Sequence, residues 1–350
     1  MRHALYSLLT WVLAFLAIAC SSSRSPVAAT QKSEDTDFTT ATVAFYNLEN
    51  LYDTEDDPAI IDESYLPTSP LQWDETRYRT KLNHLASVIE KLGSDLGPDV
   101  LGVTEVENKR VLEDLIKEPA IASRRYKIVH FESPDPRGID VALIYKPDHF
   151  EVTAQRAVRM PLPDTTMGTR DVLLVDGKLN GDPVTFLVCH WPSRRLREKS
   201  DIRRFSIARQ TRQLVDEKLA TNPQAKILLM GDLNDTPADS SIVHLLNASS
   251  ESRNLRPGQM YNAFFHLQGQ GKGTLFYRGK PDIFDQIILS NGLVNGSGLH
   301  YRSGSASIYA PERLTSPESK FSGEPLRTYG GRRYLGGYSD HFPVYLTLTK

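Results

Sequence analysis

Cysteine is scarce in this sequence, with only Cys20 and Cys189 among 350 residues. Two cysteines cannot form the disulfide framework of a small secreted scaffold, nor the ligand set of a zinc ribbon. Excess charge is lacking too, because 41 Lys and Arg residues face 43 Asp and Glu residues and the formal net charge is −2. A positive field over the whole molecule that would attract nucleic acid is therefore excluded, and any such field must be local.

The composition is that of a globular protein. Hydrophobic residues make up 40% of the chain and charged residues 24%, which excludes a wholly disordered or collagen-like chain. A length of 350 residues exceeds what one small domain needs, yet α/β sheets with many strands reach it as a single unit. No internal repeat is visible.

The first 19 residues predict a signal peptide. Arg2 and His3 precede an uncharged run whose apolar core, Leu8–Ala19, is too short to span a bilayer comfortably. A buried N-terminal helix is the alternative reading. The polar, serine-rich stretch at residues 21–40 argues against that helix and predicts a disordered tether, so we expect the protein to be exported.

The end of the apolar run resembles a bacterial lipobox, with Ala17 at the third position before Cys20, where the motif has leucine. The resemblance implies cleavage before Cys20 and a lipid on its sulfur, which would anchor the protein to a membrane of the bacterial cell envelope. A plain periplasmic or secreted protein is the alternative. The expected parts are a signal peptide at residues 1–19, the lipidated Cys20 with a tether to residue 40, and one folded domain over residues 41–350.

Hydrophobic periodicity predicts a chain in which strands alternate with a few helices. Consecutive strands mixed with helices indicate two packed sheets with helices outside. The stretch from 290 to 338 is rich in Gly, Ser, Tyr and Arg and predicts long loops, which in a compact domain are usually functional or disordered. The predicted helices are 78–92, 109–117, 201–219 and a short one near 240–246, and the strands are 43–48, 100–106, 126–131, 140–145, 150–158, 171–179, 184–190, 226–230, 286–289 and 342–348.

Polar side chains stand at the ends of several of these apolar strands. Each has an ordinary structural explanation by itself, as a turn residue, a helix cap or a strand-end histidine. Their repeated occurrence at strand edges favours one site built on a rigid scaffold. Oxygen ligands without a Cys/His cluster suit Mg²⁺ or Mn²⁺ and phosphate chemistry rather than zinc. The residues are Asn47, Glu49, Glu105, His190, Asp232, Asn234, Asp285, Asp340 and His341.

Seven short motifs, in chain order, resemble the endonuclease/exonuclease/phosphatase superfamily over roughly residues 41–348. The resemblance implies the deoxyribonuclease-I-like fold, a four-layered α/β sandwich of two packed mixed β-sheets flanked by helices. It also implies hydrolysis of a phosphoester by an activated water. The motifs are Asn47-Leu48-Glu49, Val103-Thr104-Glu105, Arg137-Gly138-Ile139-Asp140-Val141-Ala142, Cys189-His190-Trp191-Pro192-Ser193-Arg194, Gly231-Asp232-Leu233-Asn234, Asp285-Gln286-Ile287 and Ser339-Asp340-His341-Phe342-Pro343-Val344.

The resemblance also implies the ligands of the metal ion. It makes Glu105 the principal ligand, with Asn47 and Asp340 nearby and Glu49 reaching the ion through water. Glu49 stands where many relatives have Asp or another residue, so its position departs from the common pattern. His341 would be the general base or a phosphate-polarising imidazole.

The other catalytic roles follow from the same resemblance. Asp285 would orient His341, because a carboxylate on one ring nitrogen fixes the tautomer and raises the basicity of the other. Asp232 and Asn234 would position the attacking water and a phosphate oxygen. His190 would protonate or stabilise the leaving oxygen.

A local excess of arginine follows His190 and predicts contacts with substrate phosphates, for which Ser193, Arg194 and Arg195 are the candidates. A solvated basic helix face is the alternative. Tyr/Arg-rich stretches after residue 300 could likewise stack bases or pack on themselves.

Three functions are compatible with this sequence. They are a nuclease that degrades nucleic acid, a phosphatase or phospholipase-type hydrolase of a small phosphoester such as an inositol phosphate or a sphingolipid, and a catalytically inactive binding module. The intact set of acidic and histidine residues argues against the third. We expect an extracytoplasmic, Mg²⁺- or Mn²⁺-dependent endonuclease that acts as a monomer.

Overall fold

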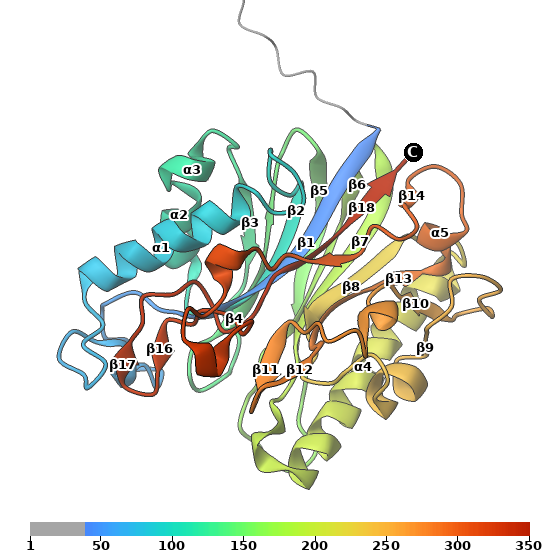
Figure 1. Cartoon of the computed structure of the whole chain (residues 1–350). Helices are drawn as coiled ribbons and strands as arrows, with labels where there is room; N and C mark the ends of the chain where they lie inside the picture. The colour runs from blue at the N-terminus through green and yellow to red at the C-terminus, as the bar shows by residue number, and fades with distance from the viewer. Residues whose placement is uncertain (1–38) are drawn as a thin grey trace, which may run out of the picture. The chain divides into compact units, whose positions relative to one another are not determined.

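The computed structural model describes residues 39–350 (Figure 1). The predicted signal peptide, Cys20 and the tether up to residue 38 lie outside the described residues. Two mixed seven-stranded sheets form the middle of the fold. The first contains β1 (Thr40–Leu51), β2 (Val100–Val106), β3 (Lys127–His130), β4 (Asp140–Tyr145), β14 (His300–Tyr301), β15 (Ser307–Ile308) and β18 (Val344–Thr349). The second contains β5 (Phe150–Val158), β6 (Val172–Leu179), β7 (Asp182–His190), β8 (Ile227–Asp232), β9 (Ala248–Ser249), β10 (Met260–Asn262) and β13 (Asp285–Ser290).

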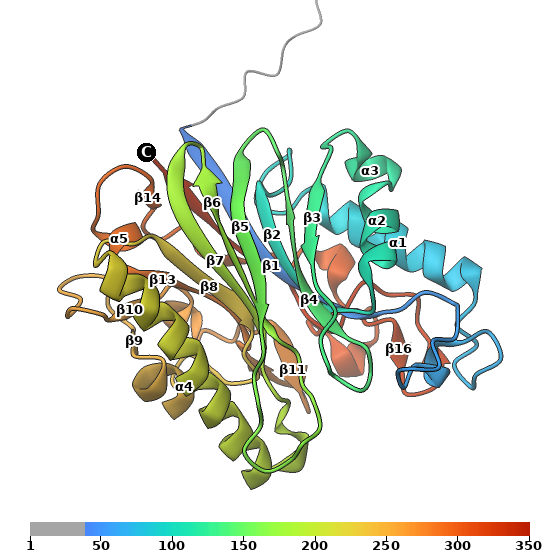
Figure 2. The same ribbon diagram turned by 180° about the vertical axis from the view of Figure 1, so that it is seen from behind.

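Helices cover the outer faces of both sheets, as Figures 1 and 2 show from opposite sides. The helices α1 (Glu75–Ile89), α2 (Lys109–Ile116) and α3 (Pro119–Ala122) lie over the first sheet, and α4 (Glu198–Thr221) lies over the second. A short α5 (Asn291–Val294) follows β13. The predicted four-layered α/β sandwich is therefore confirmed. Among the helices of residues 39–350, none combines the length and apolar character that crossing a lipid bilayer requires.

Strand periodicity explains how one chain fills three apolar layers. Along β1, Val43 and Phe45 face the core between the sheets, whereas Ala44 and Tyr46 face the helices α1–α3. Neighbouring residues take opposite faces because successive side chains of a strand alternate. In β8 the same alternation sends Leu228 and Met230 between the sheets and Ile227 and Leu229 toward α4. Both faces of each central strand are therefore buried, which accounts for their continuous apolar runs.

Strand order brings the predicted site residues to one edge of the sandwich. In the first sheet β1 runs parallel to β2, and in the second β7 runs parallel to β8, so the carboxyl ends of each pair meet. The strand β13 runs antiparallel to β8 and opens with Asp285 directly opposite Asp232. The strand β18 runs antiparallel to β1, so the residues before Val344 lie beside the end of β1.

The predicted boundaries are confirmed for three strands and shifted for one helix. The strands β2, β4 and β5 have the predicted bounds, whereas α1 begins and ends three residues before the predicted helix. The Asp74 side chain accepts a hydrogen bond from the backbone N–H of Arg77 at 2.9 Å and caps this earlier start. The stretch predicted as long loops also contains α5 and several two-residue strands, which carry no periodic signal.

Candidate active site

Four strand ends place the first group of predicted site residues together. The His190 Nε2 atom lies 3.8 Å from Glu105 Oε1 and 3.7 Å from Asp232 Oδ2. The Asn47 amide donates a 3.1 Å hydrogen bond to Asp232 Oδ2. Residues from both sheets thus contact one another, since Asn47 and Glu105 come from β1 and β2 whereas His190 and Asp232 end β7 and β8.

Backbone strain accumulates at the same edge. Glu49 and Glu105 have φ values of 51° and 61°, in the left-handed region that L-residues other than Asn and Asp rarely adopt, and Asn234 has a φ of 50°. The pairing of β1 with β2 shifts register between Asn47 and Leu51, and that of β2 with β4 shifts across Glu105. Such conformations cost roughly 1–3 kcal/mol each and cluster at functional sites, where the surrounding structure enforces them.

His341 and Asp285 form a close buried pair of titratable groups in this region. The His341 Nδ1 atom lies 2.7 Å from Asp285 Oδ2, and the two residues are 7% and 0% exposed. Burial by itself would lower the pKa of His341, but the Asp285 carboxylate outweighs it, with help from Asp232 and Asp340, and the pKa is well above its usual value. The other ring nitrogen, Nε2, lies 3.8 Å from Asp232 Oδ2 and 3.9 Å from Asp340 Oδ1.

Ser339 ties this histidine to β1. Its hydroxyl donates a 2.7 Å hydrogen bond to the carbonyl of Asn47 and accepts a 3.0 Å bond from the N–H of His341. The serine is buried, so neither bond competes with solvent. The segment that carries Asp340 and His341 is thereby held against the end of β1.

Asp232 and His190 have opposite protonation tendencies. The pKa of Asp232 is raised to about 7, chiefly by burial and also by the charges of Asp285 and Glu105, against the opposing effect of His341. The pKa of His190 lies well below its usual value because of burial and because the Arg170 cation disfavours a second positive charge. The imidazole of His190 is therefore neutral near pH 7.

Asn234 completes the turn after β8. Its backbone N–H donates to Asp232 Oδ1 at 3.0 Å, and its amide donates to the Trp191 carbonyl at 3.0 Å. The first bond orients the Asp232 carboxylate through the backbone two residues later, and the second links the turn to Trp191, the residue after β7. Asn234 thus lies beside both strand ends that carry the acid and the histidine.

Glu49 is oriented by a network that the sequence did not reveal. Its Oε2 atom accepts hydrogen bonds from the Thr328 N–H and hydroxyl at 2.7 and 2.6 Å, and it lies 3.3 Å from Lys81 Nζ. Burial raises the pKa of Glu49 against the opposing effect of Lys81. A signal for Lys81 was available, because it stands on the apolar face of α1, three residues after Tyr78 and four before Leu85.

A buried arginine holds the end of β7. The Arg170 guanidinium donates to the carbonyls of His190 and Trp191 at 3.2 and 2.8 Å and to Asp135 Oδ2 at 2.7 Å. Both charged side chains are about 95% buried, so the pair is well shielded from water. No local pattern marks Arg170, because its partners lie on segments distant in sequence.

The predicted phosphate-contacting residues lie beside the site but differ in availability. The Arg194 guanidinium donates to the Asn234 carbonyl and to Asp235 at 2.8 and 3.0 Å, and it lies over the Phe284 ring. Its positive charge is therefore already engaged by this chain. Ser193 and Arg195 are exposed. Phosphate contact by these residues stays a prediction.

Two clusters of metal-capable side chains occur within residues 39–350. Ligand atoms of Asp232, Asp285 and His341, all buried, lie within 4.8 Å of one another. His130, Glu132 and Asp140 form the second such cluster. The first cluster lies among the predicted site residues, and Asp285 Oδ1 there is buried without a hydrogen-bond partner.

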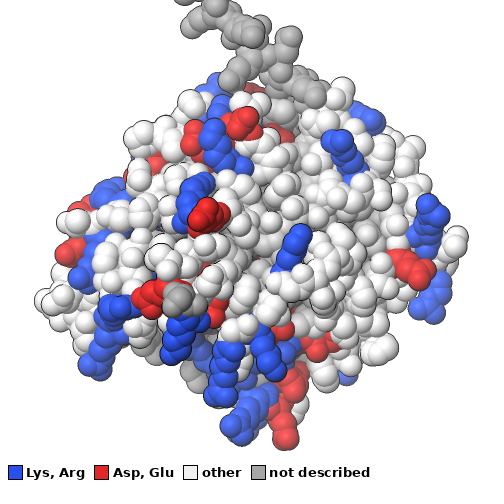
Figure 3. All heavy atoms as spheres, viewed as in Figure 1, with Lys and Arg blue, Asp and Glu red and all other residues white. Residues whose placement is uncertain are grey.

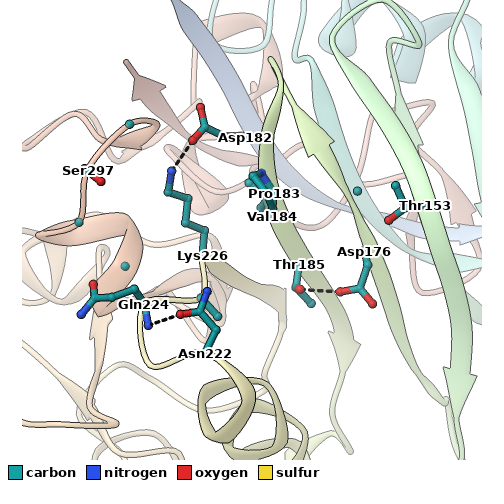
Figure 4. Close-up of a pocket in the computed structure, with 15 residues that line it drawn as sticks. Thr153, Asp176, Asp182, Pro183, Val184, Thr185, Asn222, Gln224, Lys226 and Ser297 are labelled. Atoms are coloured by element: carbon teal, nitrogen blue, oxygen red, sulfur yellow. Dashed lines mark hydrogen bonds and ion pairs between the residues drawn. The ribbon is translucent and has the colours of Figure 1, made fainter.

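A separate cavity of about 460 Å³ lies at the opposite ends of β7 and β8 (Figure 4). Asp182 opens β7, eight residues before His190, so the cavity is roughly 26 Å along the strand from the histidine. Its charged and polar side chains satisfy one another, since Lys226 pairs with Asp182 and the Thr185 hydroxyl donates to Asp176 at 2.6 Å. This cavity takes no part in the candidate site.

Comparison with known proteins identifies relatives of the whole folded part. The sequence model of the Endonuclease/Exonuclease/phosphatase family matches residues 42–350. A search of curated protein sequences gave no match.

Solved structures with the same architecture include three that cover 89% of this chain. They are D. rerio TDP2 complexed with a single-strand DNA product (14% identity, 100% of that chain, TM-score 0.54), an endonuclease/exonuclease/phosphatase family protein from Bacteroides thetaiotaomicron (16%, 98%, 0.55) and the human Nocturnin catalytic domain with a bound sulfate anion (16%, 94%, 0.53). At these identities the likeness shows a shared fold.

Proposed function

The chain belongs to the endonuclease/exonuclease/phosphatase family and is a phosphoester hydrolase, and on that premise we propose that it is a divalent-metal-dependent endonuclease of nucleic acid. The observation that carries the proposal is the convergence of Glu105, His190, Asp232 and the His341–Asp285 pair at one edge of the sandwich. D. rerio TDP2, which shares the fold, was solved with a single-strand DNA product, and this supports a nucleic-acid substrate.

The residues at this edge fit a hard divalent cation. The donors are carboxylate and carboxamide oxygens, which Mg²⁺ and Mn²⁺ prefer. Glu105, Asn47 and Asp340 would hold the ion, and Glu49 would reach it through water with the oxygen that Thr328 leaves free. Bound there, the ion would neutralise charge on the phosphate and polarise its oxygens.

The chain's own residues supply the remaining chemistry. Asp285 would hold His341 with Nε2 directed at the phosphate, where the imidazolium that its raised pKa favours would polarise an oxygen. To act as the base instead, the ring would first have to lose its Nε2 proton. Asp232, oriented by the Asn234 N–H, would accept a hydrogen bond from the attacking water. The neutral His190, whose Nε2 lies 3.7 Å from Asp232 Oδ2, would donate to the leaving oxygen.

We also propose that the protein is an exported lipoprotein whose catalytic domain covers residues 41–350. Support comes from the sequence, in which an apolar run ends at Cys20 before a polar stretch. Fractionation of the wild type and of Cys20→Ala tests this. Equal solubility of the two forms in the periplasm or medium would contradict lipidation.

The central test is hydrolysis of a substrate panel by wild type and Glu105→Gln. The panel contains plasmid, single-stranded DNA, RNA, bis-p-nitrophenyl phosphate, inositol phosphates and sphingomyelin, each with Mg²⁺, Mn²⁺ or EDTA. Removing the carboxylate should lower turnover at least about 100-fold, the scale of losing one key electrostatic contact in the transition state. The control is Glu113→Gln, on the exposed side of α2, which should retain full activity.

Two results would contradict the proposal. Undiminished turnover by Glu105→Gln in excess EDTA would remove the metal assignment. Hydrolysis of inositol phosphates or sphingomyelin without cleavage of any nucleic acid would favour the small-phosphoester hydrolase instead.

A further inference from the structure

A groove of about 1140 Å³ opens between two hairpins of the second half of the chain. One wall is β11 (Leu275–Tyr277) and β12 (Lys280–Asp282), joined by a tight turn at Arg278. The other wall is the segment 316–335, which contains the hairpin of β16 (Tyr329–Gly330) and β17 (Arg333–Tyr334). Within this part of the fold the two walls come from segments about 40 residues apart in sequence.

Both walls are fastened to the candidate active site. On one side the Phe276 ring packs edge-on against Phe342, the residue after His341, with ring centroids 6.4 Å apart. The Phe342 N–H also donates to the carbonyl of Thr274 at 2.7 Å. On the other side Thr328, which follows the groove residue Arg327, binds Glu49 through its N–H and its hydroxyl. Both walls of the groove are therefore held by segments that also carry candidate site residues.

Aromatic rings paired with cations project on each wall. Tyr277 is 64% exposed and Phe321 38%, which is high for rings of this size. The Arg278 guanidinium lies 5.3 Å from the centre of the Tyr277 ring, and the Lys320 ammonium lies 5.3 Å from the centre of the Phe321 ring. Exposed rings beside cations in one groove are the pattern by which proteins stack bases and follow a sugar-phosphate backbone.

The charge of the groove is positive. Among its lining residues only Glu318 and Glu324 are acidic, and Glu318 is paired with Arg333. Arg278, Lys320 and Arg327 make no ion pair with any carboxylate among residues 39–350. Figure 3 shows Lys and Arg side chains gathered along the lower edge of this face, where the start of α4 lies as well as the β11–β12 hairpin (Figure 1).

We propose that this groove binds the single-stranded segment of nucleic acid next to the scissile phosphate. Bases stack on Tyr277 and Phe321, and the cations of Arg278, Lys320 and Arg327 contact the flanking phosphates. A duplex does not fit this role, because paired and stacked bases hide the faces that the rings would cover. The proposal rests on the endonuclease function and adds to it a preference for single strands.

The test compares a long and a short substrate on the same enzyme. A single-stranded oligonucleotide would occupy the groove, whereas bis-p-nitrophenyl phosphate reaches only the scissile position. Tyr277→Ala and Phe321→Ala should each raise KM for the oligonucleotide about tenfold, the scale of one lost base stack. Both variants should hydrolyse bis-p-nitrophenyl phosphate like the wild type.

The matched control is Leu96→Ala. Leu96 is 47% exposed and lies before β2, at the edge of the sandwich opposite the site, so its loss should change neither reaction. In Arg278→Glu, KM for the oligonucleotide should also depend less steeply on salt concentration, because a phosphate contact has been removed.

Three other results would contradict either the groove proposal or the endonuclease function. A wild-type KM for the oligonucleotide in Tyr277→Ala/Phe321→Ala would overturn the groove proposal and leave the endonuclease function intact. An equal loss on both substrates would overturn it too, since the rings would then support the site itself. Cleavage of sphingomyelin micelles, impaired by these variants, together with inert oligonucleotides would refute the endonuclease function.

Discussion

The buried ion pair of Lys81 and Glu49 provides a quantitative test of how the site is held together. The charged atoms lie 3.3 Å apart, with the side chains 1% and 10% exposed. At an effective dielectric constant of about 20 this separation corresponds to an attraction of about 5 kcal/mol. Removing one partner leaves the other charge buried, so Lys81→Met and Glu49→Gln should each lower the free energy of unfolding by about 3–5 kcal/mol.

The double variant separates this account from simple loss of contacts. Lys81→Met/Glu49→Gln leaves no unpaired charge, and the new amide still accepts from Thr328, so its loss should be several kcal/mol smaller than the sum of the single losses. Urea denaturation in EDTA measures the free energy of unfolding of the wild type, the two single variants and the double variant. The exposed pair Glu75–Arg79 on the same helix is the control, with an expected coupling below about 1 kcal/mol. Additive losses at Lys81 and Glu49 would refute the reasoning.

Three further predictions concern the dyad, the core and the free thiol. Asp285→Asn and His341→Ala should each lower kcat steeply, and the double variant should lose little more, because the two groups act in one step. Multiplicative losses of kcat in the folded double variant would show that they act independently. Phe186→Ala should lower the free energy of unfolding by about 3–5 kcal/mol in urea, since its ring is fully buried and packs edge-on against a neighbouring phenylalanine. Burial raises the pKa of Cys189 to about 12, so in Cys20→Ser the thiol should resist iodoacetamide at pH 8.5 until the protein unfolds; rapid labelling of folded protein would contradict this.

Local patterns predicted the long elements because burial of a strand or helix face leaves a periodic record in the sequence. The strands β2 and β4 have the predicted bounds, since each is a nearly continuous run of buried residues. The strand β5 has them too, although only Phe150 among its residues is buried. The hairpin of β11 and β12 was missed, because three-residue strands are too short for a period to be recognised. Its turn at Arg278-Gly279, where both residues have positive φ, was the signal that could have revealed it.

From the sequence alone, the residue types at the strand ends, their order along the chain and the class of chemistry they support could all be inferred. Which side chain contacts which was decided by the tertiary structure. Glu49 meets Thr328 across 279 residues, a contact for which the sequence has no signal. The contact of Asp285 with His341 across 56 residues was expected only from the family resemblance. The ion pair of Arg194 with Asp235 was likewise not visible in the sequence. The reason is physical: side-chain periodicity depends on neighbours in sequence, whereas polar pairing at a sheet edge depends on strand order and register, which bring distant segments within hydrogen-bond reach.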